Sequence, residues 1–153
     1  MTSEAFTQAI TDMMHTLYRV CYSQLRNGYD REDAVQEALY RAWNKRTQLR
    51  DDRFFNTWVI RILLNECRNI QRRNSYRRFH ENDITDDIPE PEGVVKELHD
   101  AILELPEKLR LPIILHHMEG YRVKEVSIIL RIPQGTVKTR LAAGRRELEK
   151  LLK

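Results

Sequence analysis

The chain has 153 residues, of which 41% are hydrophobic and 32% are charged, and its formal net charge is +3. This length allows one domain or two small ones, and the composition is too apolar for a fully disordered chain. No apolar run approaches the ~20 residues that a membrane-spanning helix needs, and the first residues lack the apolar core of a secretion signal. Two cysteines, Cys21 and Cys67, are too few for a disulfide framework, so we expect a cytoplasmic protein in which both pack in the core.

The small net charge conceals a strong segregation of charge along the chain. Residues 53–80 carry a net charge of +6, residues 81–100 carry −7, and residues 101–153 carry +5. Two basic blocks on either side of an acidic strip suggest two surfaces for a polyanion such as nucleic acid, joined by a tether. Ordinary solvated helices also carry basic blocks, so charge by itself leaves that alternative open.

Helical periodicity dominates the first half of the chain. Apolar residues recur at every third or fourth position between Phe6 and Leu25, which predicts an amphipathic helix that ends at Gly28. Asp30 is a candidate N-cap for a second helix, and a third helix is expected to begin near Phe54. No segment alternates strictly between apolar and polar residues, so no strand is expected. Three aromatic residues at helical spacing are expected in the core: Trp43, Phe54 and Trp58.

A change of composition divides the chain in two. Residues 74–93 lose the helical periodicity and are rich in Asn, Asp, Pro and Gly, which is typical of a solvated linker. Helical periodicity then resumes and continues to Leu152. We therefore expect an all-α fold of two small helical domains joined by an acidic flexible linker. The expected bounds are 1–76 for the first domain, 77–95 for the linker and 96–153 for the second domain.

The strongest local pattern is a helix-turn-helix near the C-terminus. A helix over residues 122–130 is followed by a three-residue turn and by a second helix that begins at Gln134. One face of this second helix carries groups that can contact DNA phosphates or base edges. These are Gln134, Lys138, Thr139, Arg140, Arg145 and Arg146. A generic helical hairpin with a solvated basic face would show the same spacing.

Several stretches, in this order, resemble the extracytoplasmic-function (ECF) sigma factors of bacterial RNA polymerase, in the superfamily of the housekeeping sigma factors. Residues 120–141, with the core Ile-Pro-Gln-Gly-Thr-Val-Lys-Thr-Arg at 132–140, resemble the promoter-reading C-terminal domain of that family. Residues 33–43 and 55–73 resemble its first domain. The resemblance covers nearly the whole chain. It implies a protein without catalytic activity, cofactor or metal that binds core RNA polymerase, directs promoter-specific initiation and helps to open the DNA strands.

The resemblance also assigns a role to each part of the chain. Asp33, Gln36 and Glu37 fall on the helix that in the family docks on core RNA polymerase, whose beta and beta-prime subunits are the expected partners. The third helix and a following loop at 74–79 would hold the −10 element of promoter DNA as a separated strand with one base flipped out. The candidates for that role are Asn65, Asn69, Arg72, Arg73, Tyr76 and Arg77. The helix-turn-helix would read the −35 element of the promoter.

Five positions depart from the family pattern or from helical preference. Arg131 stands in the turn where members usually have glycine, so either Arg131 adopts a positive φ, at a cost of about 1 kcal/mol, or the turn differs from that of the family. Ala142 and Ala143 replace an aromatic residue and an arginine, which leaves the base preference open. Pro112 should kink or restart its helix, and Gly144 costs its helix about 1 kcal/mol but permits close packing.

The resemblance further implies an anti-sigma partner that covers both DNA-binding surfaces, a free monomer and no insertion in a membrane. Two other functions fit part of the sequence. A helix-turn-helix regulator would bind DNA tightly without polymerase, and a helical adaptor would tolerate charge reversal at Lys138 and Arg145. A metal site is not expected, because His116 and His117 point about 100° apart on a helix and no Cys/His set has zinc spacing.

Overall fold

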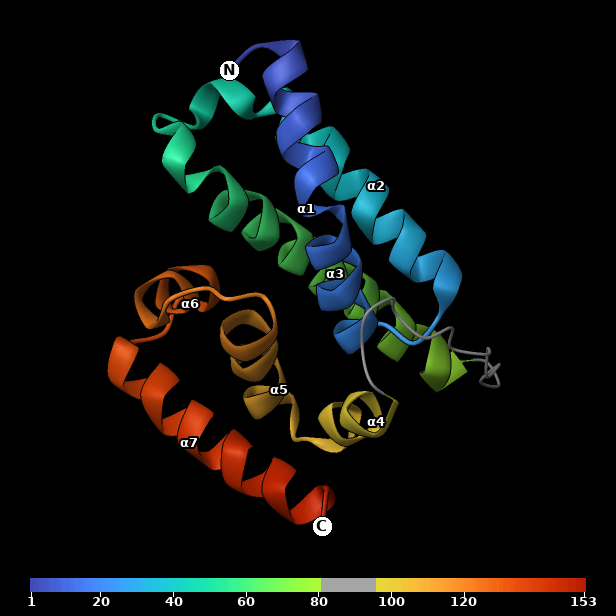
Figure 1. Cartoon of the computed structure of the whole chain (residues 1–153). Coiled ribbons are helices and arrows are strands. Elements are labelled where there is room, and N and C mark those ends of the chain that lie inside the picture. Colours follow the sequence, from blue (N-terminus) through green and yellow to red (C-terminus); the bar gives the residue numbers. More distant parts are fainter. Residues whose placement is uncertain (81–95) are drawn as a thin grey trace. The chain divides into compact units, whose positions relative to one another are not determined.

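The computed structural model describes residues 1–80 and 96–153, apart from the side chains of residues 77–80 and 96. Every regular element in these residues is a helix, which confirms the all-α prediction (Figure 1). The chain divides into two compact units, Met1–Pro89 and Glu90–Lys153. The expected linker at 77–95 lies outside the described residues except at its start. Among the helices described, none combines the length and the apolar character that a membrane span requires.

The first unit consists of three helices that pack on one another, α1 (Ser3–Gln24), α2 (Gly28–Asn44) and α3 (Phe55–His80). Two short 3₁₀ turns, Arg46–Gln48 and Asp52–Phe54, connect α2 to α3. The long connection between α2 and α3 is therefore ordered by local turns.

The turn between α1 and α2 differs from the prediction. Asn27, rather than Asp30, is the N-cap of α2, and its side chain accepts hydrogen bonds from the amides of Tyr29 and Asp30 at 2.8 and 3.2 Å. Gly28 therefore begins α2 instead of ending the helix before it. The buried guanidinium of Arg31 donates to two carbonyl groups of the connection, at 3.1 and 3.0 Å, and so satisfies acceptors that the end of α1 leaves open.

The apolar positions predicted for the first helix form the core of this unit. Residues of that stripe, from Phe6 to Leu25, are at most 8% exposed. Trp43 and Trp58 are partly buried, and Trp43 packs edge-on against Phe6 with ring centroids 5.1 Å apart. Phe54, which was also predicted to be in the core, is 51% exposed. The second helix contributes small residues that allow close packing: Ala34, Ala38 and Ala42.

The third helix is longer than predicted. The loop expected at 74–79 is wrong, because α3 continues to His80 and so includes the first four residues of the expected linker. No glycine or proline occurs between Phe55 and Pro89, and arginine is a good helix former. The amide of Asn74 also donates to Asp30 Oδ2 at 2.9 Å, which attaches this turn of α3 to α2. The polar composition of residues 74–79 predicted that the third helix ends there, whereas these residues are its last turns.

The second unit contains α4 (Lys96–Glu104), α5 (Glu107–Ile113), a π-helical turn (Ile114–Met118), α6 (Val123–Leu130) and α7 (Gln134–Leu151). Helices α4, α5 and α6 each contact α7. The bounds of α6 and α7 confirm the predicted helix-turn-helix.

The disturbance expected at Pro112 takes the form of the π-helical turn. Pro112 lies in α5 and has no amide hydrogen to continue the ordinary ladder. The next turn widens, and the amide of Glu119 donates to the carbonyl of Ile114 five residues earlier, at 2.9 Å. Gly120, with φ of 80°, then ends the helical segment.

Candidate nucleic-acid and protein interfaces

The turn of the helix-turn-helix has a defined geometry. Arg131 adopts the left-handed conformation, with φ of 57° and ψ of 45°, which is the first of the two alternatives expected at this position. Ser127 closes the turn from the α6 side: its hydroxyl donates to the carbonyl of Ile132 at 2.5 Å, and its own carbonyl accepts the Ile132 amide at 3.2 Å. These two hydrogen bonds offset the strain at Arg131 and fix where α7 begins.

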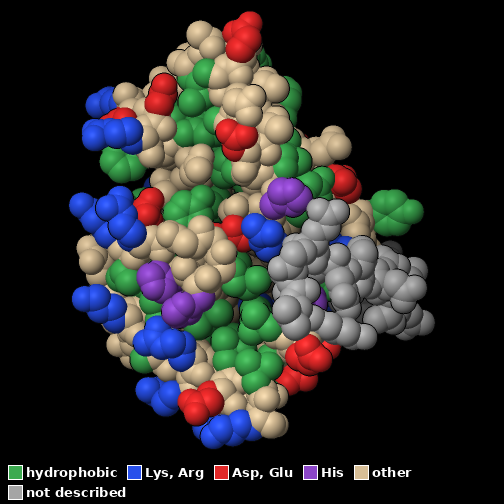
Figure 2. Space-filling view, in the orientation of Figure 1, with side chains coloured by type: hydrophobic (Ala, Val, Ile, Leu, Met, Phe, Trp, Pro, Cys, Tyr) green, Lys and Arg blue, Asp and Glu red, His purple; other side chains and the backbone are tan. Residues whose placement is uncertain are grey.

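The predicted DNA-contacting residues lie on the open side of α7, which we call the α7 face. Val137 and Leu141 are at most 3% exposed and anchor α7 in the second unit. Five members of the set are exposed and Arg140 is half-buried. The exposed members are Gln134, Lys138, Thr139, Arg145 and Arg146. Basic side chains recur along the edge of the second unit that α7 forms (Figure 2). The arrangement can contact a polyanion along the length of the helix.

Close packing against α5 positions α7. Gly144 is buried, and a Cβ atom there would lie 2.7 Å from Ile113 Cγ1 and 2.9 Å from Ile113 Cδ1. Ile113 itself is 1% exposed, so it has little room to move away. The predicted close packing at Gly144 is confirmed.

The π-helical turn contributes a neighbour to the α7 face. The guanidinium of Arg145 lies with Nη1 3.2 Å from His117 Nε2. Burial, the adjacent His116 and Arg145 all lower the pKa of His117, which favours a neutral imidazole that can accept a hydrogen bond from the guanidinium. His116 contacts the carbonyl of Tyr121 through Nδ1 at 2.7 Å. The two rings thus serve different partners, as expected from their adjacent positions.

The outer side of α3 carries the residues predicted for a separated strand, and we call it the α3 face. Asn65, Asn69, Arg72 and Tyr76 are exposed, and their spacing places them within one stripe of the helix. Arg73 lies beside this stripe, and its Nη2 is 3.8 Å from Asp30 Oδ1. The side chain of Arg77 lies outside the described residues.

Phe54 was missed as a member of the α3 face. It stands immediately before α3, is 51% exposed, and falls in register with Trp58, Asn65 and Arg72 along the helix. An exposed aromatic ring can stack on an unpaired base. The sequence did contain a pattern that could have predicted this exposure. Phe54 directly follows the charged residues Asp51–Arg53, and such neighbours favour a position at the surface.

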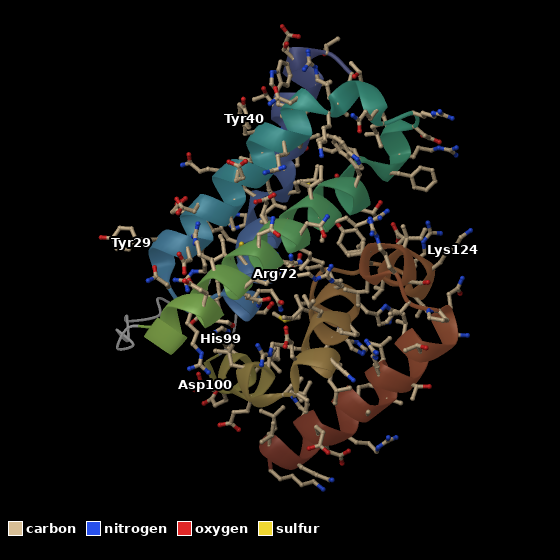
Figure 3. All side chains as sticks on the ribbon, turned by 180° about the vertical axis from the view of Figure 1, so that it is seen from behind. Tyr29, Tyr40, Arg72, His99, Asp100 and Lys124 are labelled. Atoms are coloured by element: carbon tan, nitrogen blue, oxygen red, sulfur yellow. The ribbon has the colours of Figure 1, made fainter. Side chains whose placement is uncertain are left out.

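The cluster predicted on α2 lies at the surface. Asp33 and Gln36 are exposed and the carboxylate of Glu37 is half-exposed. The sequence reading missed two tyrosines on the same stripe, Tyr29 and Tyr40, which are 83% and 63% exposed. Both point away from the unit, near opposite ends of α2 (Figure 3). These residues together form what we call the α2 stripe. Exposed aromatic residues around a few polar groups are typical of protein-binding surfaces.

Neighbouring helices hold both flanks of the α2 stripe. On one side, the hydroxyl of Tyr18 on α1 donates to the two carboxylate oxygens of Glu32 at 2.9 and 2.8 Å. Burial and this hydrogen bond raise the pKa of Tyr18 to about 12, so the phenol keeps its proton. On the other side, Arg41 Nε lies 3.1 Å from Glu37 Oε1 and 2.7 Å from Glu66 Oε1, which belongs to α3.

The described residues offer little for other chemistry. Within residues 1–80 and 96–153, no group of three or more His, Cys, Asp or Glu side chains could hold a metal ion. Cys21 and Cys67 are fully buried, with their sulfur atoms 3.7 Å apart, as the core assignment predicted. The contact with Cys67 and burial raise the pKa of the Cys21 thiol, which disfavours the reactive thiolate.

Comparison with known families matches both units. Residues 9–77 match the family model "Sigma-70 region 2", and residues 96–148 match "Sigma-70, region 4". The chain is 30% identical to the ECF RNA polymerase sigma factor SigW of Bacillus subtilis, over 98% of this chain and 90% of that protein. It is 26% identical to the ECF RNA polymerase sigma-E factor of Escherichia coli K12, over 95% of this chain and 85% of that one.

Solved structures show the same fold. One is the sigma factor RpoE in complex with the anti-sigma factor NepR from Bartonella quintana, which matches with a TM-score of 0.85, 24% identity and 97% coverage of both chains. Another is CnrH in complex with the cytosolic domain of CnrY, with a TM-score of 0.75, 23% identity, and coverage of 99% of this chain and 89% of that one. At these identities the likeness concerns the fold.

Proposed function

The chain belongs to the ECF sigma factors of RNA polymerase, and we propose that it binds core RNA polymerase, directs it to specific promoters and helps to open the DNA strands. The observation that carries this proposal is the presence of both sigma regions in one chain, each with its predicted polar residues at the surface. A regulator that binds DNA by itself would use the helix-turn-helix but would have no use for the first unit.

The α2 stripe is the proposed contact with the beta and beta-prime subunits of core polymerase. Asp33, Gln36 and Glu37 provide acceptors for cationic side chains of a partner helix. Tyr29 and Tyr40 extend the surface with large exposed rings. Tyrosines bury much area at low entropic cost and are enriched among residues that dominate binding energy.

The α3 face is the proposed site for the −10 element. Arg72 and Arg73 can pair with phosphates, while Asn65 and Asn69 offer amide groups to base edges. Phe54 and Tyr76 supply aromatic surface at the two ends of the stripe for unstacked bases. Because residues 74–79 are helical, base capture in a loop there is replaced by stacking along the helix.

The α7 face is the proposed reader of the −35 element. A recognition helix contacts base edges mainly through its N-terminal residues and the backbone through the rest. Gln134, Lys138 and Thr139 lie in the first half of α7 and are assigned to bases. Arg140, Arg145 and Arg146 lie further along and are assigned to phosphates.

An anti-sigma partner is part of the proposal. A structurally similar sigma factor, RpoE of Bartonella quintana, was solved in complex with the anti-sigma factor NepR. Such a partner would cover the surfaces assigned here to polymerase and DNA.

The proposal as a whole is tested by transcription in vitro. The purified chain is combined with core RNA polymerase and genomic promoter fragments, and the 5′ ends of the transcripts are mapped. We expect initiation at a discrete set of promoters that core polymerase alone does not use. Stable binding to core polymerase without any promoter-specific initiation would contradict the proposal.

A narrower test concerns polymerase binding. Glu37→Lys places a cation on the α2 stripe, and we expect it to weaken binding to core polymerase by about tenfold, which corresponds to ~1.4 kcal/mol. The residue is half-exposed, so circular dichroism and thermal unfolding should stay close to those of the unchanged chain. Unchanged affinity would remove Glu37 from the proposed interface.

A further inference from the structure

Glu66 is a buried acid that the proposed DNA and polymerase surfaces do not use directly. Its side chain is 9% exposed, and it lies on α3 among fully buried neighbours such as Leu63 and Cys67. Its Oε1 atom is 2.7 Å from Arg41 Nε on α2. Buried carboxylates are costly, and replacing a buried ion pair by well-packed apolar residues is often neutral or stabilising. Stability by itself is therefore a weak reason for an acid at this position.

Arg41 is shared between two carboxylates. Its Nε atom also lies 3.1 Å from Glu37 Oε1, one helical turn earlier on α2. Arg41 and Glu37 are 44% and 46% exposed, so water screens the pair that they form. The contact with Glu66 is shorter, and the Glu66 side chain is largely shielded from water, which screens its charge less. Glu66 is thus the closer and less hydrated carboxylate, while Glu37 accepts the hydrogen bond from Arg41 Nε.

Because Arg41 is shared between Glu37 and Glu66, it neutralises less of the charge that Glu37 presents at the surface. If Arg41 had Glu37 as its single partner, the pair would be close to neutral toward an approaching protein. With Glu66 compensating Arg41 from within, the three side chains carry a net charge of −1, and the exposed member is Glu37. A surface carboxylate that keeps its charge attracts a cationic partner more strongly than one already neutralised by its neighbour.

We propose that Glu66 is a positioning residue for polymerase binding: from α3 it holds Arg41 and takes up part of its charge, so that Glu37 presents a carboxylate on the α2 stripe that Arg41 compensates only in part. This inference rests on the proposed role of α2 in binding core polymerase. The partner group that fits is a cationic side chain, arginine or lysine, on the docking surface of polymerase.

The test measures the dissociation constant of the fluorescently labelled chain for core RNA polymerase, without DNA and at constant ionic strength. Glu66→Gln removes the inner charge but keeps an oxygen that can accept from Arg41, so Arg41 then neutralises Glu37. We expect binding to weaken by about threefold to tenfold. In a chain that already carries Glu37→Gln, the same change should add less than about twofold, because no charge on Glu37 remains to be neutralised.

A second variant separates this role from simple structural support. In the double variant Arg41→Gln with Glu66→Gln, no cation remains to neutralise Glu37. We expect binding to recover to within about twofold of the unchanged chain, although both ion pairs are absent. A purely structural role of Glu66 predicts no recovery.

Asp30→Asn is the matched control. Asp30 also links α2 to α3, through Asn74 at 2.9 Å and Arg73 at 3.8 Å, and the change alters the net charge by the same amount. It has no contact with Glu37 and lies seven residues away on α2, roughly 10 Å along the helix axis. We expect its affinity for core polymerase to stay within about twofold, with any loss of thermal stability comparable to that of Glu66→Gln.

The outcomes are distinct. The inference is overturned if Glu66→Gln binds like the unchanged chain, if it weakens binding equally when Glu37 is already Gln, or if the double variant does not recover. If Glu37→Gln itself leaves the affinity unchanged, the assignment of polymerase binding to this part of α2 fails, and the inference fails with it for that separate reason.

Discussion

At the C-cap of α6, Arg131 adopts the left-handed conformation that glycine would adopt at lower cost. The two hydrogen bonds between Ser127 and Ile132 hold the turn in spite of that cost, which is about 1 kcal/mol. His117 is a second single residue of this kind, because its neutral ring accepts a hydrogen bond from Arg145 on the α7 face. Single side chains outside α7 thus help to fix where the groups of the α7 face point.

The contact between His117 and Arg145 predicts a pH effect. Because burial, His116 and Arg145 lower the pKa of His117 in the folded chain, the unfolded chain binds that proton more tightly. Neutral His117 therefore makes its full contribution to the stability of the folded chain above the ordinary histidine pKa of about 6.5. This contribution is lost as the pH falls through the lower pKa that His117 has in the folded chain. In an NMR titration, we expect His117 to titrate below the ordinary value and Arg145→Gln to raise its pKa.

Lys138→Gln serves as the control for this titration, because it removes a cation from the same face without a contact to His117. It should leave the His117 pKa nearly unchanged. A His117 pKa at or above the ordinary value, or one that does not respond to Arg145→Gln, would show that the contact is absent in solution.

At the scale of elements, the direct approach of α5 and α7 sets the orientation of the recognition helix. Gly144 has no side chain at the point where Ile113 faces it, and Pro112 with the π-helical turn shapes the segment that follows. A glycine that weakens an isolated helix is thus favourable here, because tertiary contact outweighs intrinsic helix preference. The same packing keeps Val137 and Leu141 inside and the basic residues outside.

Gly144→Ala tests this packing. The added Cβ would lie 2.7 Å from Ile113 Cγ1, and overpacking of this kind costs typically about 1–3 kcal/mol, against a gain of about 1 kcal/mol in helix preference. We expect a net loss of about 1 kcal/mol in the free energy of unfolding, measured with urea. Adding Ile113→Val, which removes the Cδ1 atom, should recover part of the loss. A Gly144→Ala chain as stable as the original would contradict the packing argument.

Across the whole molecule, the net charge of +3 is a cancellation between segments of opposite charge. The segments 53–80 and 101–153, with +6 and +5, contain the α3 and α7 faces, which are assigned to separated and duplex DNA. The strip at 81–100 carries −7 and should repel the phosphate backbone. We therefore expect the strip to limit non-specific binding of the free chain to DNA.

Replacing Asp83, Asp86 and Asp87 by Asn tests this balance. These positions lie outside the described residues, and the expected effect follows from their charge. We expect a severalfold increase in affinity for non-specific duplex DNA at low salt, which should diminish as salt is raised. Replacing the same number of acids in residues 1–52, for example Glu4, Asp12 and Asp52, controls for total charge. An equal increase in both variants would mean that the strip acts only through net charge.

The sequence by itself determined the class of the fold, the helix-turn-helix and the charge blocks. These features depend on residues close together in the chain: apolar spacing, caps, and short motifs such as residues 132–140. The sequence also pointed to Arg131 as the position where the turn needs a positive φ or another geometry, and the structure shows the positive φ.

Only the tertiary structure decided features that depend on residues far apart in sequence. The contact between Asp30 and Asn74 accompanies the continuation of α3 to His80, where polar composition had suggested a loop. The exposure of a side chain depends on how the neighbouring helices pack, and this packing leaves Phe54, Tyr29 and Tyr40 at the surface. The sharing of Arg41 between Glu37 and Glu66 joins residues of two helices, and no local pattern contains it. Local preferences determine which helices form, whereas the packing of one helix on another determines which side chains remain available to a partner.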